Sequence, residues 1–245
     1  MKILPIRTAL ADAALPQRHV PTAGTFTAYR ACLRWDFGFT CAFCLLHEAD
    51  LTEHGIAGTG LMSIEHVVPQ SKDASLIDVY TNCRLACRFC NRARHDAMRT
   101  DPFGVRLLDP CEVAWSAHFE IRGAELVPLD GDRDAARTSR TYGLDDERKT
   151  KMRRDRAESL DRALRAVREV PALERAALAK ADTADAAARR GALETAEWLR
   201  GWLAWARRTI ERYRAVPLDA PAACRCGPAG ERELPSFLTR QLLDA

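Results

Sequence analysis

The hydrophobic and polar positions divide the chain into a mixed region followed by a helical one. Up to about residue 130, apolar runs of strand length alternate with loops punctuated by Gly and Pro and with short helical stretches. Beyond that point, apolar residues recur mainly at helical spacing. The pattern therefore predicts an α+β fold in three parts: an N-terminal arm over residues 1–30, a mixed module over 31–130 and a helical region over 131–245.

Short elements are expected within the mixed module. The run SIEHVV predicts a strand over residues 63–68, and HFEIRG and AELVPL flank a Gly-containing turn that predicts a hairpin over 118–129. One helix is expected near FTAYRACLRWDFG, where the Pro-containing arm ends. Another is expected over NRARHDAMR at 91–99, because no breaker follows before Pro102.

The helical region is predicted to contain several helices. Gly143 marks a break between a shorter and a longer helix, and Pro171 occupies a position where Pro is tolerated at the start of another. Trp198, Trp202 and Trp205 are spaced so that three indoles share one helix face. Helical spacing is what packing requires, so the three rings are predicted to lie in a core rather than to stack on bases.

Composition supports a globular protein and leaves its partner open. The chain of 245 residues is 47% hydrophobic, which supplies a core. Its 37 basic and 34 acidic residues leave a net charge of +3, too small by itself to indicate a nucleic-acid binder. No apolar run reaches the length of a membrane span, and the N-terminus is a poor signal peptide, so a cytoplasmic location without a membrane partner is expected.

The cysteines provide the strongest chemical signal. Two C-x-x-C pairs, each with Phe at the third position, have the spacing that brings thiolates to one tetrahedral ion; they are Cys41, Cys44, Cys87 and Cys90. A single C-x-x-C pair could be redox-active, but two pairs with the same aromatic third position are better explained by one shared zinc ion. Four thiolates leave no open position for water, so this zinc ion is predicted to be structural.

The remaining cysteines give weaker signals. Cys32, Cys83 and Cys111 have no paired spacing and are predicted to be ordinary buried thiols. Cys224 and Cys226 form a C-x-C pair, for which a second metal site is the less favoured interpretation.

The two C-x-x-C pairs are called the first and second knuckle. The string EHVVPQS…TN…CRFCN, which ends just after the second knuckle, resembles the HNH endonuclease motif, the ββα-metal finger, in the version framed by a four-cysteine zinc site. The flanks LRWDFGFTCAFC and NRARHD…LLDPCEVAWSAHFEIRGAELVPL resemble a bacterial HNH family, so the resemblance covers about residues 30–150. It implies two strands and a helix that carry a nuclease site, with a structural zinc ion beside it.

Chemistry and resemblance together give roles to four residues. Phosphodiester hydrolysis needs a base and a cation; His66 has the pKa range of a base at neutral pH, and Glu65 and Asn91 offer oxygen ligands for Mg²⁺ or Mn²⁺. In the family, the acid before the His and the residue nine positions after the middle Asn hold the catalytic ion. Asn82 and Asn91 have that separation, so Asn82 is expected to brace the loop that carries His66.

Two points about this motif stay open. His95 stands four residues after Asn91, where some related nucleases place a further ligand; a third metal ligand and a solvated helix-surface histidine are both consistent with that position. Glu65 and His66 are adjacent, so a regular strand would point them to opposite faces unless it ends or bulges there.

The surroundings of the second knuckle predict contacts with nucleic acid. From Arg84 to Arg106 there are six basic and two acidic residues, a local excess above that of the whole chain. The residues expected to contact phosphates are Lys72, Arg84, Arg88, Arg92 and Arg94. A solvated helix face is the alternative, and the basic run over 148–156 is equally consistent with a plain amphipathic helix.

The sequence therefore predicts a metal-dependent HNH endonuclease that hydrolyses phosphodiester bonds, with DNA as the expected substrate, zinc structural and Mg²⁺ or Mn²⁺ catalytic. One alternative is a non-catalytic zinc-finger module that binds nucleic acid. Another is an effector subunit that docks through its helical region on a partner such as the ATPase of a bacterial defence system, a setting that the resemblance suggests.

Overall fold

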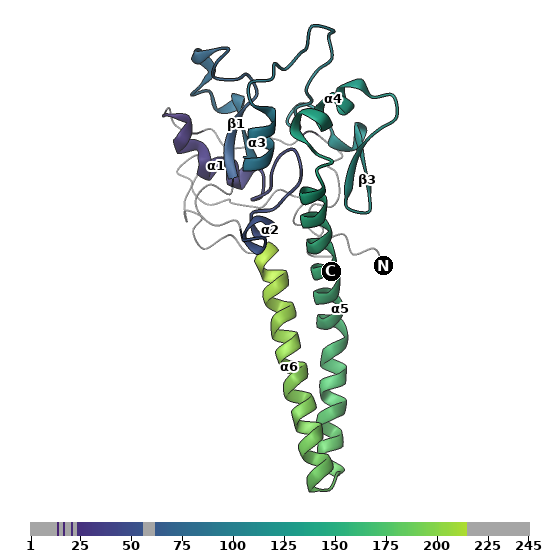
Figure 1. Cartoon of the computed structure of the whole chain (residues 1–245). Coiled ribbons are helices and arrows are strands. Elements are labelled where there is room, and N and C mark those ends of the chain that lie inside the picture. The colour runs from purple at the N-terminus through teal and green to yellow at the C-terminus, as the bar shows by residue number, and fades with distance from the viewer. Residues whose placement is uncertain (1–13, 15–16, 18–20, 22–23, 56–61, 215–245) are drawn as a thin grey trace.

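The computed structural model describes residues 14, 17, 21, 24–55 and 62–214 (Figure 1). A mixed module forms one end of the molecule, and two long helices extend from it as an arm. The predicted α+β class is confirmed, with a helical region that follows the module. Most of the predicted N-terminal segment, together with Cys224 and Cys226, lies outside the described residues.

The elements follow one another as short pieces and then long helices. In chain order they are the 3₁₀ turn Phe26–Tyr29, α1 (Arg30–Asp36), α2 (Glu48–Glu53), β1 (Met62–His66), two 3₁₀ turns (Ala74–Leu76 and Tyr80–Asn82), β2 (Cys83–Cys87), α3 (Arg88–Arg94), the 3₁₀ turn Trp115–Ala117, β3 (Phe119–Arg122), β4 (Glu125–Pro128), α4 (Arg133–Tyr142), α5 (Glu147–Thr183) and α6 (Ala186–Arg214).

Two strands and a helix form the centre of the module. β1 and β2 pair antiparallel, with Met62 opposite Cys87 at one end and His66 opposite Cys83 at the other. α3 follows β2 directly and contacts both strands. The predicted hairpin is confirmed as a separate sheet of β3 and β4. A single core packs beneath these elements and includes the four knuckle cysteines, which are almost completely buried.

α3 is shorter than the sequence predicted. It ends at Arg94, because His95 adopts a left-handed conformation with φ of 53° that no continuing helix allows. The expected helix over residues 91–99 is therefore wrong beyond Arg94, and His95 is not on a helix face.

The arm also differs from its prediction at Pro171. α5 continues through this residue to Thr183, and the turn comes at residues 184–185, where the Asp185 carboxylate accepts hydrogen bonds from the backbone of the first turn of α6. Pro171 removes one backbone hydrogen bond, but Val170 beside it is fully buried against α6, and the Ala-rich segment that follows favours a helix. Packing therefore outweighs the expected break, whereas Gly143 ends α4 as predicted.

The tryptophan stripe is not a core. The seam between α5 and α6 is built from small and branched residues, Ala163, Ala166, Val170, Leu199, Leu203 and Ala206. Trp198 and Trp202 are 65% and 38% exposed and pack on each other with ring centroids 5.6 Å apart, whereas Trp205 packs partly against the seam. The seam is filled by these alanine, valine and leucine side chains, and Trp198 and Trp202 lie outside it, so the prediction of a buried stripe is wrong for two of its three rings.

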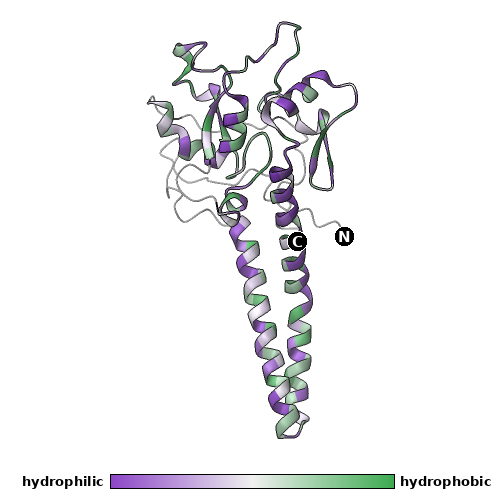
Figure 2. Ribbon diagram, viewed as in Figure 1, coloured by the Kyte–Doolittle hydropathy of each residue, from purple (hydrophilic) through white to green (hydrophobic). Residues whose placement is uncertain are grey.

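Polar and apolar residues alternate along both arm helices (Figure 2). None of the helices that the structure describes combines the length and the apolar character needed to cross a membrane.

Candidate functional site

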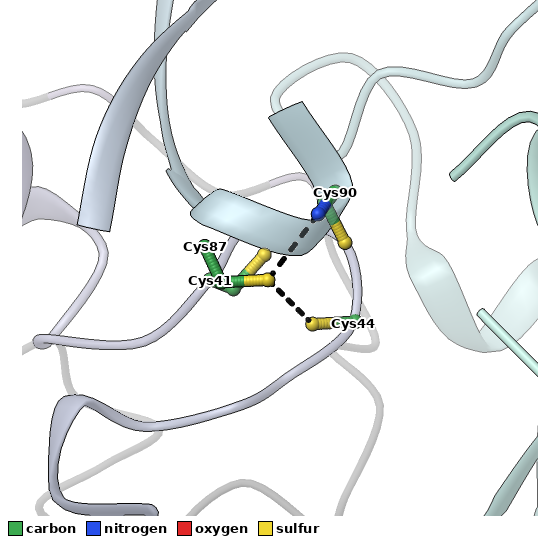
Figure 3. A group of neighbouring side chains, drawn as sticks. All are labelled: Cys41, Cys44, Cys87 and Cys90. Atoms are coloured by element: carbon green, nitrogen blue, oxygen red, sulfur yellow. Dashed lines mark hydrogen bonds between the residues drawn. The ribbon is translucent and has the colours of Figure 1, made fainter. Parts of the chain in front are cut away.

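The four knuckle cysteines converge on one point between the first knuckle and the start of α3 (Figure 3). Their Sγ atoms all lie within 4.8 Å of one another. A tetrahedral ion with Zn–S bonds of about 2.3 Å would need sulfur atoms about 3.8 Å apart, so only small shifts are required. Cys87 also caps α3, since its Sγ accepts a hydrogen bond from the Cys90 backbone N–H at 3.5 Å. The donor set and its geometry fit a structural zinc ion.

Three of the four thiols have shifted pKa values. Burial alone would raise the pKa of Cys41, but hydrogen bonds from the three other thiols lower it well below its ordinary value. Hydrogen bonding to Cys41 raises the pKa of Cys87, and burial raises that of Cys90. A bound divalent cation would favour the thiolate form of these buried groups.

A cleft of about 510 Å³ opens at the other end of β1. It is lined by the last residues of β1, the loop that follows, and α3 with the turn after it: Ile64, Glu65, His66, Pro69, Gln70, Ser71, Asn91, Arg92, Arg94, His95 and Asp96. The structure thus brings together at one cleft Glu65, His66, Asn91 and His95, which the sequence had grouped.

His66 is held in one tautomer by its neighbours. Its Nε2 lies 3.0 Å from the carbonyl oxygen of Ile77. Because a carbonyl only accepts hydrogen bonds, Nε2 carries the proton and Nδ1 keeps its lone pair, with the Gln70 side-chain nitrogen 3.1 Å away. Burial lowers the pKa of His66 below its ordinary value, and the Phe26 ring packs edge-on at 5.0 Å. The imidazole is therefore neutral at neutral pH, and Nδ1 is its basic atom.

Asn82 ties together the loop between β1 and β2. Its Oδ1 accepts a hydrogen bond from the Val68 N–H at 2.8 Å, and its Nδ2 donates to the carbonyl oxygens of Val68 at 3.1 Å and Leu76 at 3.0 Å. Leu76 directly precedes Ile77, whose carbonyl orients His66. These bonds are of the kind that a bracing role requires, and that role stays a prediction.

Glu65 is buried beside a guanidinium. Its residue is 2% exposed, and its carboxylate forms an ion pair with Arg94, which also donates to the backbone carbonyls of His66 and Val67. Burial raises the pKa of Glu65 to about 7, although Arg94 acts to lower it. Arg94 therefore points inward, and the expectation that it contacts phosphate is wrong because its charge is buried and paired.

Asn91 docks α3 on β1. Its Nδ2 donates to the Ser63 hydroxyl at 2.9 Å and to the Ile64 carbonyl at 3.3 Å. Ser63 and Glu65 thus face α3, whereas His66 faces the following loop, so adjacent residues alternate as in any strand. No bulge is needed, because the cleft lies at the end of β1 and borders both faces.

His95 stands on the open side of the cleft. Its side chain is 82% exposed, and its Nδ1 lies 2.8 Å from the Asp96 carboxylate. It lines the cleft from the turn after α3, so it does not share a helix face with Asn91, although its backbone N–H still donates to the Asn91 carbonyl at 3.2 Å.

The predicted phosphate contacts divide into exposed and buried residues. Lys72, Arg88 and Arg92 are exposed near the cleft and the knuckle. Arg84 is buried and forms a two-bond ion pair with Asp109, with Nε and Nη2 donating at 2.8 and 2.5 Å. Its expected contact with nucleic acid is therefore wrong, since the carboxylate already occupies the face of the guanidinium that would bind phosphate.

Residues 41–97 match the family model described as HNH endonuclease. This segment is an HNH domain. It spans both knuckles, the two strands, α3 and the cleft, and it implies a role in binding nucleic acid. No curated protein and no solved structure gives a significant match to the chain.

Three groups that contact the candidate site residues were not predicted from the sequence. Gln70 and the Ile77 carbonyl orient His66, and neither residue type signals that role in advance. Arg94 as the partner of Glu65 had a signal, because it stands three residues after Asn91 and so shares the helix face that packs on β1.

Proposed function

We propose that the chain is a metal-dependent endonuclease that hydrolyses phosphodiester bonds, with DNA as substrate. The observation that carries the proposal is the orientation of His66, whose Nε2 is fixed by a carbonyl so that a basic Nδ1 is presented at an open cleft. A non-catalytic zinc module would have no use for a buried, tautomer-fixed histidine there.

In this mechanism His66 acts as the general base. Nδ1 takes a proton from a water molecule as the water oxygen attacks phosphorus, and the bond from phosphorus to the leaving oxygen breaks. The Gln70 amide shifts from Nδ1 to make room for that water. Asn82 keeps the loop, and with it the Ile77 carbonyl, in position so that the imidazolium formed remains hydrogen-bonded.

Glu65 and Asn91 are proposed to hold Mg²⁺ or Mn²⁺, with His95 as a third ligand from the open side of the cleft. When bound, such a cation neutralises the charge that develops on the phosphate and the leaving oxygen. The oxygens of a carboxylate and an amide suit a hard cation. Arg94 lies within reach of the same carboxylate and must share it with the cation.

Lys72, Arg88 and Arg92 are proposed to bind backbone phosphates on either side of the cleft. All three are exposed, and Arg92 itself lines the cleft. Such contacts position the duplex without reading its sequence.

The test is cleavage of supercoiled plasmid by protein with its zinc content measured. A chelator would remove the structural zinc as well as the catalytic cation. The catalytic cation is therefore removed by dialysis and then added back as Mg²⁺ or Mn²⁺. His66→Ala is expected to lose cleavage by about 10²- to 10⁴-fold while zinc content and thermal unfolding stay unchanged. His54→Ala is the matched control, because His54 pairs with Asp155 outside the cleft. Equal cleavage by His66→Ala and wild type would refute the proposal.

The exposed Trp198–Trp202 pair favours a second candidate function, that of an effector subunit which docks on a partner protein in bacterial defence. A Trp198→Ala, Trp202→Ala variant would then cut naked plasmid normally but fail to co-purify with the partner that wild-type protein retains, expected to be an ATPase. Co-purification of the variant at the wild-type level would exclude this role for the pair.

A further inference from the structure

Three buried cations on one face of α5 lie beside the four-cysteine cluster and the end of the first knuckle. Lys149, Arg153 and Arg156 are spaced four and three residues apart, so their side chains leave α5 on the same side. Each is at most 4% exposed. Charged side chains are rarely buried without a partner, so this face requires a source of negative charge.

Two of the three cations contact the four knuckle cysteines directly. Lys149 Nζ lies 3.5 Å from Cys90 Sγ, and it also donates to the Gly143 carbonyl at 2.8 Å. Arg153 Nη1 donates to the carbonyl oxygen of Cys44 at 3.1 Å. The base of the arm thus contacts both knuckles.

Arg156 extends the contact to the residue after the first knuckle. Its Nη1 donates to the Leu45 carbonyl at 3.0 Å and to the Asp50 carboxylate at 2.7 Å. Asp50 also caps α2 by accepting a hydrogen bond from the His47 backbone. Asp50 is therefore the carboxylate partner of this cationic face, and it neutralises one of the three charges.

The charges balance when zinc is bound. A zinc ion with four thiolates carries two negative charges, and Asp50 adds a third, which together equal the three cations of α5. Lys149 lies against a ligand sulfur and Arg153 against the carbonyl oxygen of another ligand residue, so loss of the ion removes the charged group that these buried cations face. Because a buried charge without its partner is unfavourable, zinc loss is expected to weaken the docking of α5.

We propose that α5 completes the zinc site: Lys149, Arg153 and Arg156 are positioning residues that supply its counter-charge, and zinc occupancy thereby fixes the arm to the HNH domain. The ion then has two functions, to fold the HNH domain and to clamp the helical arm beside it. This inference is independent of whether the cleft cleaves DNA.

Zinc release tests the counter-charge directly and requires no activity. The rate at which zinc passes to an excess of chromogenic chelator is compared for wild type, Lys149→Met, Lys149→Arg and Lys151→Met. Lys149→Met keeps the length of the side chain but loses its charge, and about 10- to 100-fold faster release is expected. Lys149→Arg keeps the charge and is expected to restore most of the slow release. Lys151→Met is the matched control, because Lys151 is exposed and pairs with Asp155.

Either of two outcomes would overturn the role of Lys149: release from Lys149→Met at the wild-type rate, or release from Lys149→Arg as fast as from Lys149→Met. Circular dichroism of the zinc-loaded proteins shows whether each variant is folded. If Lys149→Met does not fold, Arg153→Met is measured in its place.

Hydrogen exchange tests the clamp. In wild-type protein with and without zinc, the amides of residues 150–157 are compared with those of residues 163–170, which pack on α6. Zinc removal is expected to lower protection at least tenfold in the first segment and to leave the second within a few-fold. Equal loss in both segments, or no loss in the first, would show that zinc does not hold the base of α5.

Discussion

The zinc cluster and the cleft occupy opposite ends of the same β-hairpin. Met62 pairs with Cys87 at the cluster end of the two strands, and His66 pairs with Cys83 at the cleft end. α3 joins the two sites, since Cys87 caps its start and the helix carries Asn91. At the cluster, the donor atoms converge and are enclosed, whereas at the cleft Glu65 and Asn91 are held by other protein groups and His95 stands on the open side.

This difference shows that the residues that stabilise the HNH domain are separate from those proposed to carry out its chemistry. A closed set of four thiolates leaves no position for water or substrate, so its ion can only stabilise. At the cleft, the Glu65 carboxylate is paired with Arg94, so a cation proposed to bind there would share the carboxylate with a guanidinium. Each site is therefore expected to respond differently when one of its residues is changed.

The largest effect is expected at the cluster. Cys87→Ser, or zinc removal from wild type, should unfold the HNH domain, because structural zinc contributes about 10–16 kcal/mol in small domains and whole domains are stable by about 5–15 kcal/mol. Near-ultraviolet circular dichroism and zinc content measure the loss. Cys83→Ser is the control, since Cys83 is equally buried in β2 but lies outside the cluster. A folded Cys87→Ser variant with a full complement of zinc would remove the distinction between the two sites.

Asn82 is expected to give an intermediate effect that is confined to the cleft. Asn82→Ala breaks three buried hydrogen bonds and leaves loop backbone groups unpaired, which should lower the free energy of unfolding by about 2–4 kcal/mol. Cleavage should fall by about 10- to 100-fold as the His66 loop loosens, while zinc content stays full. Thr81→Ala, at the exposed neighbouring position, should change neither. Zinc loss in Asn82→Ala would contradict the independence of the two sites.

The sequence predicted the parts of this unit that depend on local spacing. Paired cysteines in tight turns, a short strand that carries Glu65 and His66, and a hairpin around a Gly turn are each specified within a few residues. The structure contains these elements, although β1 spans Met62–His66 and not the predicted 63–68, and the four-cysteine cluster forms.

The failures share a physical cause, namely that burial depends on the whole fold. Arg84 and Arg94 lie in a basic segment of the kind that binds phosphate. Each instead forms an ion pair with a carboxylate from a distant segment, Arg84 with Asp109 and Arg94 with Glu65. Trp198 has the spacing of a core residue, yet the seam of the arm is formed on α6 by the neighbouring stripe of Leu199, Leu203 and Ala206. Periodicity predicts that side chains share a face but does not predict what that face meets.

The smallest effect, and the one that separates the roles of Glu65 and His66, is the pH dependence of cleavage. Burial raises the pKa of Glu65 to about 7, so at lower pH protons compete with the cation for its carboxylate. If Glu65 is a ligand, the cleavage rate at limiting Mg²⁺ decreases as the pH is lowered below about 7. Each tenfold increase in Mg²⁺ concentration then shifts this acidic limb of the pH profile to lower pH by up to about one unit. Burial lowers the pKa of His66, so its own limb lies below the ordinary histidine range and does not respond to Mg²⁺. A limb that stays fixed across the Mg²⁺ series would show that protonation of His66, and not of Glu65, limits cleavage in acid, and would remove Glu65 from the proposed ligand set.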